Sequence, residues 1–324
     1  MNKTKDKNNI CITNKYIISK TIEFILTLFL VSIISFLLVK LSPVDAAEAY
    51  AQRVMFTPSE AEIEALRVSM GVYDPIWVQY IDWLKGAVVF DFGSSYVNGL
   101  PVLPQLLTSL GFTISIVGLV AILDTIIVVL MGSIMFALRK KWIKALFVAL
   151  CLIALSVPPF FYATTFINFF SVKLGLTQII GNQGLMRYLP AAICYIIGTS
   201  AFFIPLFNIN LEKIMKSDSA YYARCRGLSE SKIVIKYALP VAITSLIPSF
   251  FQMLGLSFAG SIIVERVFAL PGLGNLIMTS VLGRDVPLIH TTLLTLAVIL
   301  AVFNILADIS RRLISKNDGN MEVL

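Results

Sequence analysis

The chain has 324 residues, of which 57 % are hydrophobic and only 14 % carry a charge. A soluble domain has about 25 % charged residues, and the charges here are bunched between long apolar runs, so composition excludes an ordinary water-soluble domain. The formal net charge of +7 is compatible with nucleic-acid binding, but the placement of the basic residues argues against it, as shown below.

Six segments are long and apolar enough to cross a bilayer core of about 30 Å, which takes about 20 helical residues. None of them alternates with period two, so we expect helices rather than barrel strands. The predicted spans are Thr21–Leu41, Gly111–Leu138, Trp142–Phe169, Leu189–Leu211, Pro240–Val264 and Leu288–Ile309. The first follows a Lys- and Asn-rich tail without a small-residue cleavage site, which favours a span over a secretory signal.

The Lys and Arg residues set the predicted orientation. Eighteen of the 26 lie before the first span or in the segments 139–144, 213–236 and 311–316. These segments share one side of the membrane, so the positive-inside rule predicts that both termini are cytoplasmic. The basic charge therefore reflects topology, and we expect no nucleic-acid partner.

The spans divide the chain into parts. We expect a cytoplasmic tail at 1–20, the first span at 21–41 and an external folded loop at 42–110. A core of five further spans follows at 111–310 and contains short cytoplasmic helices at 212–239. A second cytoplasmic tail occupies 311–324.

The external loop carries eight acidic and three basic residues between Ser42 and Thr108. Thr57-Pro58-Ser59-Glu60 matches a capping box with Pro at the first helical position. The apolar positions of Ile63–Met70 then fall on one stripe, and Gly71 is suited to end the helix. The loop is therefore predicted to be a small folded cap, serving either as a structural lid or as a contact for an external partner.

Few polar groups fall inside the predicted spans. Asp124 lies about thirteen residues into the second span, where an ionised Asp costs about 2.5–3.5 kcal/mol, so it should face protein or water. It either lines a polar path or pairs with a neighbouring helix. His290 is the single histidine, and no metal site is predicted around it. The cysteines lack metal-type spacing and are expected to be reduced: Cys11, Cys151, Cys194 and Cys225.

The connection between the fourth and fifth spans predicts two short helices. Ser217 or Asp218 can cap the first, which should stop at Gly227. Ser229 can cap the second, which should end where Pro240 opens the next span. A helix this short and polar is not stable alone and is not buried in lipid, so we expect an interaction element or, alternatively, a cap on the helix bundle.

The same connection resembles the cytoplasmic signature of permeases from binding-protein-dependent ABC importers, which is Glu-Ala-Ala, three residues, Gly, nine residues and Ile-x-Leu-Pro. Tyr221-Tyr222-Ala223, Gly227 and Tyr237-Ala238-Leu239-Pro240 keep every spacing, although the three tyrosines depart from the consensus. The resemblance implies ATPase-coupling residues at Tyr221, Tyr222, Ala223, Arg224, Gly227, Leu228, Leu239 and Pro240. We expect the small Ala223 and Gly227 to let this helix enter a partner's groove.

Further stretches resemble the B-type permease of the subfamily that imports dipeptides, oligopeptides and nickel. Asp91-Phe92-Gly93-Ser94-Ser95 resembles the subfamily's Asp-x-Gly-x-Ser element. Residues Glu265, Pro271-Gly272-Leu273-Gly274 and Arg284-Asp285 resemble the re-entrant turn before its last helix. The resemblance extends from about Thr21 to Arg312. The candidate site residues are Thr57, Glu60, Asp91, Gly93 and Ser95 in the external loop, and Glu265, Pro271, Gly272, Gly274, Arg284 and Asp285 in the turn.

The resemblance implies an all-α membrane protein with six spans, the type I ABC importer permease fold, an external loop subdomain and a cytoplasmic coupling helix. It implies alternating access and four kinds of partner: a homologous permease, two ATP-binding subunits, an extracytoplasmic solute-binding protein and membrane lipid. The sequence has no Walker A pattern, so ATP and Mg²⁺ are expected in the ATPase subunits and this chain is not expected to be an enzyme. Peptides, nickel and metal chelates all remain open as substrates.

Two other classes of function are compatible with a multispan chain. An ion-coupled secondary transporter should show inverted repeats and several intramembrane charges, whereas the second span holds one central acid. A membrane-embedded enzyme should cluster His, Cys, Asp or Glu at working depth, and the single histidine and scattered cysteines do not.

Overall fold

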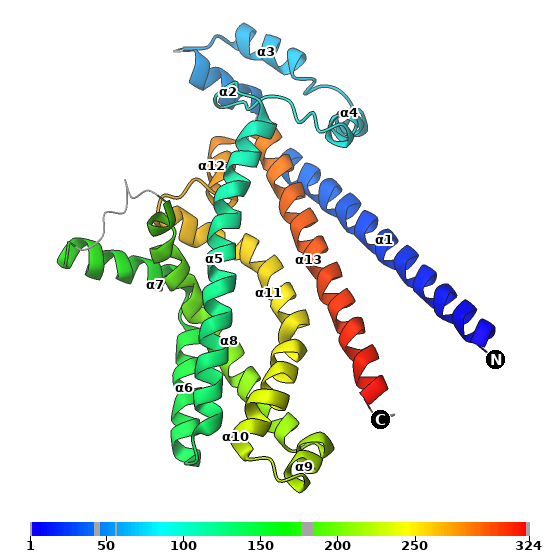
Figure 1. The fold of residues 1–324 in the computed structure, drawn as a ribbon. Helices are drawn as coiled ribbons and strands as arrows, with labels where there is room; N and C mark the ends of the chain where they lie inside the picture. Colours follow the sequence, from blue (N-terminus) through cyan, green and yellow to red (C-terminus); the bar gives the residue numbers. More distant parts are fainter. Residues whose placement is uncertain (1, 42–45, 56, 176–183, 322–324) are drawn as a thin grey trace. The chain divides into compact units, whose positions relative to one another are not determined.

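The computed structural model describes residues 2–41, 46–55, 57–175 and 184–321 (Figure 1). Within these ranges the chain is helical apart from turns and one antiparallel bridge between Ser94 and Pro101, which confirms the all-α class. The helices are α1 (Asn2–Lys40), α2 (Ala46–Val54), α3 (Glu60–Ser69), α4 (Ile76–Val88), α5 (Val102–Ala137), α6 (Lys141–Ser156), α7 (Pro159–Phe166), α8 (Leu189–Met215), α9 (Asp218–Cys225), α10 (Glu230–Ile233), α11 (Leu239–Val267), α12 (Leu273–Gly283) and α13 (Val286–Met321). Two π-helical segments, Ile167–Lys173 and Val234–Ala238, and a 3₁₀ turn at Gly184–Arg187 complete them.

The chain forms two compact units. The first contains residues 1–111 and 275–305, and the second contains residues 112–274 and 306–324. The predicted external loop lies in the first unit, together with α1 and most of α13. The predicted coupling segment and Asp124 lie in the second.

Among the described residues, five helices are long and apolar enough to cross a membrane, and a bent pair makes up to six. The five are Ile18–Lys40, Val102–Ala137, Leu189–Met215, Glu230–Val267 and Val286–Ile314. The bent pair is Lys141–Ser156 with Pro159–Lys173, at an angle of 89°. The predicted number of six spans is reached if the bent pair forms one span.

The third span is not the continuous helix that we predicted over Trp142–Phe169. The chain breaks at Val157 and Pro158, both of which have extended backbone angles. Proline lacks a backbone N–H and disfavours helical geometry in the residue before it, so Pro158 ends α6, and Pro159 then starts α7 at a position where proline is tolerated.

The second short cytoplasmic helix also differs from its prediction, because it does not end before Pro240. Glu230–Val267 is one long helix that passes through the π-helical turn Val234–Ala238. There the N–H of Leu239 bonds the carbonyl of Val234, one residue farther back than in an α-helix. The widened turn ends two residues before Pro240, which has no N–H to continue the regular pattern.

Two apolar clusters form the core of the second unit. One joins α8 to α9, α10 and α11 through residues that include Phe207, Leu211, Ile233 and Ala238. Gly132 of α5 lies so close to Phe207 that a Cβ would stand 2.5 Å from its ring. The other cluster joins α5, α7, α8 and the end of α11: Ile116, Val120, Ala163, Ala191, Ala192, Cys194, Ile196, Val264, Phe268 and Leu270. The small members of this cluster, Ala163, Ala191 and Ala192, allow close packing between helices in lipid.

Candidate functional sites

The predicted coupling helix is α9, and its end matches the sequence prediction. Ser217 precedes it with an extended backbone at the N-cap position. At the other end Gly227 has φ +77°, and the N–H groups of Gly227 and Leu228 bond the carbonyls of Arg224 and Ala223. This is a Schellman motif, in which glycine takes the left-handed position. A Cβ at Gly227 would meet nothing within 4 Å, so its backbone angle rather than space requires glycine.

The two faces of α9 have different surroundings. Ala220 and Ala223 are buried in the core cluster of α8, α10 and α11. Tyr221 and Tyr222 are 61 % and 67 % exposed, with ring centroids 6.1 Å apart. The small side chain of Ala223 therefore serves packing within this chain, which corrects the expectation that it enters a partner's groove. The two tyrosines are the large apolar side chains that this helix exposes.

Arg224 connects α9 to the helices before and after it. Arg224 Nε lies 2.6 Å from Glu230 Oε1, and an Arg224 guanidinium N–H also donates to the Met215 carbonyl at the end of α8, over 3.0 Å. Leu239 is half-buried and Pro240 is exposed at the start of α11. Ala223, Arg224 and Leu239 thus contact other cytoplasmic helices of this chain.

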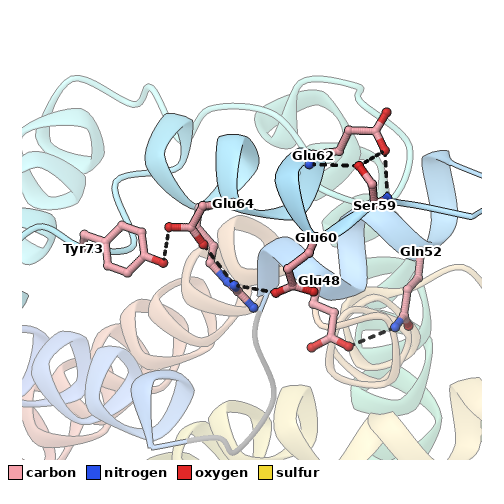
Figure 2. A network of polar contacts seen from close by, with 8 residues as sticks. Glu48, Gln52, Ser59, Glu60, Glu62, Glu64 and Tyr73 are labelled. Atoms are coloured by element: carbon pink, nitrogen blue, oxygen red, sulfur yellow. Dashed lines mark hydrogen bonds and ion pairs between the residues drawn. The ribbon is translucent and has the colours of Figure 1, made fainter.

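The external loop contains the predicted helix, but its cap is displaced by two residues (Figure 2). Ser59, not Thr57, is the N-cap, and its reciprocal partner is Glu62, not Glu60. The Ser59 N–H donates to Glu62 Oε2 over 2.8 Å, and Ser59 Oγ accepts from the Glu62 N–H over 3.3 Å. Backbone and side-chain donors of Ser59 lower the pKa of Glu62. Both Thr57 and Ser59 are followed three residues later by Glu, so the pattern alone could not choose, and the Ser59 register places Ile63 inside.

The C-terminal end of α3 lies where the sequence predicted it. Gly71 has φ +64°, and the Val72 N–H bonds the Arg67 carbonyl over 3.0 Å, so α3 also ends in a Schellman motif. Arg67 pairs with Glu60 and Glu64, and Tyr73 donates to Glu64 over 2.7 Å (Figure 2). Such exposed pairs contribute little, so the buried Ile63 and the two caps define the helix.

Asp285 connects the two motif regions of the first unit. Its buried carboxylate accepts from the Ser95 hydroxyl, from the Tyr96 N–H over 3.1 Å and from the Val97 N–H over 3.3 Å. We call this arrangement the Asp285 cradle. Burial and the neighbouring carboxylate raise the pKa of Tyr96. The resemblance marked Ser95 and Asp285 separately, and only the structure shows that they touch.

Local geometry supports the Asp285 cradle on both sides. Asp91 Oδ1 accepts from the Gly93 N–H over 3.1 Å, and Gly93 has φ +71°. Arg284 has φ +53° at the end of α12, where the Asp285 N–H bonds the Ser280 carbonyl over 2.8 Å. These turns present the carboxylate of Asp285 to its donors.

Glu265 forms a second buried acid site at the end of α11. Its Oε1 accepts from Thr113 Oγ over 2.7 Å and from Ser261 Oγ over 3.0 Å. Gly272 lies directly against the carboxyl group, leaving no room for a Cβ. The Leu273 N–H donates to Thr113 Oγ over 2.8 Å, which holds the start of α12. Two neighbours complete the turn, Pro271 within it and Gly274, which packs on the backbone of Ile262.

Asp124 is buried against α8. Its Oδ1 accepts from the hydroxyls of Ser200 and Thr199, the latter over 3.2 Å. Its Oδ2 has no hydrogen-bond partner in the part of the chain that the structure describes. These contacts are those of a pair between helices, which was one of the two predicted roles, and a place on a translocation path stays a prediction.

His290 lies in an aromatic cluster of the first unit. Its Nδ1 is 2.7 Å from Ser35 Oγ, and its ring stacks on Phe36 at a centroid distance of 5.4 Å. Among the described residues, no three His, Cys, Asp or Glu side chains gather in a way that could hold a metal.

The sequence matches two known family patterns. Residues 128–317 match the binding-protein-dependent transport system inner membrane component, and residues 13–117 match the N-terminal pattern of these membrane components. The chain belongs to this family. A Brucella abortus (strain 2308) protein named as a peptide transport system permease is 30 % identical over 304 residues, covering 90 % of this chain and 95 % of that protein. The glutathione transport system permease protein GsiC of Escherichia coli (strain K12) is 28 % identical over 295 residues, covering 91 % and 95 %.

Family membership settles the broad function. This chain is a multispan permease subunit of a binding-protein-dependent importer, and its role is transport rather than catalysis. The comparisons give no support to a secondary transporter or a membrane-embedded enzyme.

Proposed function

We propose that this chain is the B-type permease of an ATP-driven importer and that α9 couples it to an ATPase subunit. The observation that carries this proposal is the pair Tyr221 and Tyr222, which is exposed on a helix that the buried Ala220 and Ala223 hold against the core. Exposed aromatic side chains on a fixed element are typical of protein interfaces. Their position in the cytoplasmic signature indicates an ATPase as the partner.

The complete importer would contain a second, homologous permease, two ATPase subunits and an external solute-binding protein. ATP and Mg²⁺ would bind in the ATPase subunits. The distribution of basic residues supports cytoplasmic termini and an external α2–α4 loop. ATP binding would move α9, and the spans would alternate between outward and inward access.

The proposed substrate is a short peptide. Its support is the printed names of the two relatives, one a peptide permease and the other a glutathione permease, and glutathione is itself a tripeptide. Neither name mentions nickel, so we prefer a peptide to nickel or a metal chelate.

Reconstitution of the whole complex in proteoliposomes tests this function. We expect uptake of labelled di- or tripeptides. This uptake should require ATP on the side of the membrane that the ATPase subunits face and binding protein on the opposite side. A complex whose ATPase subunits cannot hydrolyse ATP is the matched control. Peptide uptake driven by an ion gradient without ATP would contradict the mechanism, whereas ATP-dependent uptake of nickel but not peptide would contradict the substrate.

A further inference from the structure

One side chain of α4, that of Tyr80, contacts the C-terminal part of α1. Tyr80 Oη lies 2.8 Å from Ser32 Oγ, and the Tyr80 ring meets Phe36 edge-on at 5.5 Å. Trp83, three residues after Tyr80, approaches the His290 ring at 5.4 Å. All these residues belong to the first unit, and Tyr80 and Trp83 connect α4 to α1 and α13.

These contacts give the depth of α4 along the span. The membrane-length part of α1 ends at Lys40. At 1.5 Å per residue, Ser32 lies about 12 Å and Phe36 about 6 Å before that end. The hydrocarbon core is only about 30 Å thick, and Lys side chains extend toward the headgroups. Tyr80 therefore contacts α1 at the level of the lipid, not above the membrane.

A second face of α4, next to the one that carries Tyr80 and Trp83, is apolar and exposed in the part of the chain that the structure describes. Trp77, Ile81 and Val88 are 68 %, 45 % and 72 % exposed. Spacings of four and seven residues place them on one helical stripe. Asp82 and Lys85 lie beside this stripe and pair over 2.9 Å. An apolar stripe with Trp next to a charged edge is typical of helices that lie in the membrane interface.

We propose that α4 lies in the membrane interface and that Trp77, Ile81 and Val88 contact lipid. Lipid, rather than the binding protein, is the occupant because the Tyr80 side chain of the same helix touches α1 at lipid depth. Continuity with α1 supports this, since α1 exposes apolar side chains such as Phe29 and Leu30 along the same span. With the proposed orientation of the termini, the leaflet is the external one. The segment that precedes the Asp285 cradle would thus be anchored by the bilayer itself.

Spin labels on neighbouring residues test the proposal. The complex is placed in nanodiscs after Cys11, Cys151, Cys194 and Cys225 are changed to alanine, and a nitroxide is attached to Ile81→Cys or Asp82→Cys. Relaxation by oxygen, which concentrates in lipid, is compared with relaxation by a water-soluble nickel chelate. We expect the oxygen-to-nickel accessibility ratio to be higher at 81 than at 82. Asp82 is a matched control because both residues are exposed on the same helix, and losing one surface ion pair has little effect.

Other results would overturn the proposal. Equal aqueous access at both labels, with residue 81 protected only when binding protein is added, would assign the stripe to that partner. Low access of both reagents at 81 would assign it to the second permease.

A second measurement applies if the cysteine-free chain does not assemble. Brominated lipids should then quench part of the tryptophan fluorescence of the otherwise unmodified complex, and the Trp77→Phe variant should lose that quenched part. Unchanged quenching in Trp77→Phe would contradict lipid contact.

Discussion

The Asp285 cradle and α9 were both marked by motif resemblance, but they use their residues differently. In the Asp285 cradle the charged and hydroxyl groups are buried and satisfied within the chain. In α9 the buried residues, Ala220 and Ala223, are small and apolar, and two large aromatic side chains remain exposed. A motif residue can therefore stabilise the fold or remain exposed for contact with a partner, and its burial distinguishes the two roles.

Asp285→Asn should have the largest effect, lowering stability by about 3 kcal/mol. The amide would turn its own N–H₂ toward the Ser95 hydroxyl or the N–H groups of Tyr96 and Val97, and buried hydrogen bonds to a charged group contribute about 1.5–3 kcal/mol. Thermal unfolding of the purified complex measures this. An unchanged transition would show that the Asp285 cradle does not stabilise the first unit.

Ser95→Ala should have a smaller effect, about 1–2 kcal/mol. It removes one donor to Asp285 and also the acceptor of the Val97 and Asn98 N–H groups. The Tyr96 and Val97 N–H groups still donate to Asp285, so the loss of stability should be less than for Asp285→Asn. If Ser95→Ala proved the more damaging of the two, the hydroxyl rather than the carboxylate would organise the loop.

Gly227→Ala should cost about 1–2 kcal/mol, because a left-handed backbone is unfavourable for residues with a Cβ. The reverse change at the end of α11, Ala269→Gly, should be neutral or stabilising, since Ala269 already has φ +50°. Comparing the two transition temperatures provides an internal control. Equal destabilisation by both changes would mean that helix termination does not depend on these angles.

Asp124→Asn should change stability by less than about 1 kcal/mol. The side-chain oxygen of Asn can still accept from the hydroxyls of Ser200 and Thr199, and Oδ2 has no hydrogen bond among the described residues to lose. Unfolding and peptide uptake are measured together. Normal stability with altered uptake would favour a place on the translocation path, whereas a large loss of stability would contradict this account of its contacts.

The sequence predicted features that depend on local chemistry and missed those that depend on contacts distant in the chain. Gly71 and Gly227 were identified as helix ends because glycine is the usual residue in the left-handed position. Phe90, Ala269 and Arg284 take the same kind of conformation with φ +50° to +60°, and nothing in their chemistry indicates it. Local strain at such residues is imposed by the surrounding structure.

Burial was the other feature that the sequence could not supply. Ala223 and Tyr222 are adjacent in the signature, yet one is 6 % exposed and the other 67 %. The contact between Ser95 and Asp285 spans 190 residues, and no periodicity reports a pairing over that distance. The six apolar segments could be predicted because their length and hydropathy are properties of single stretches.

The proposed coupling role of α9 is tested most directly by replacing its exposed tyrosines. Tyr221→Ala with Tyr222→Ala should change stability by no more than about 0.5 kcal/mol, because exposed side chains away from buried contacts have small effects. Cys225→Ala, at another exposed position of α9, is the matched control. In proteoliposomes that contain the whole importer, we expect the tyrosine variant to lose ATP hydrolysis stimulated by the binding protein, while the control keeps it. Normal stimulated hydrolysis and uptake in a correctly assembled tyrosine variant would contradict the proposal that α9 couples this permease to its ATPase.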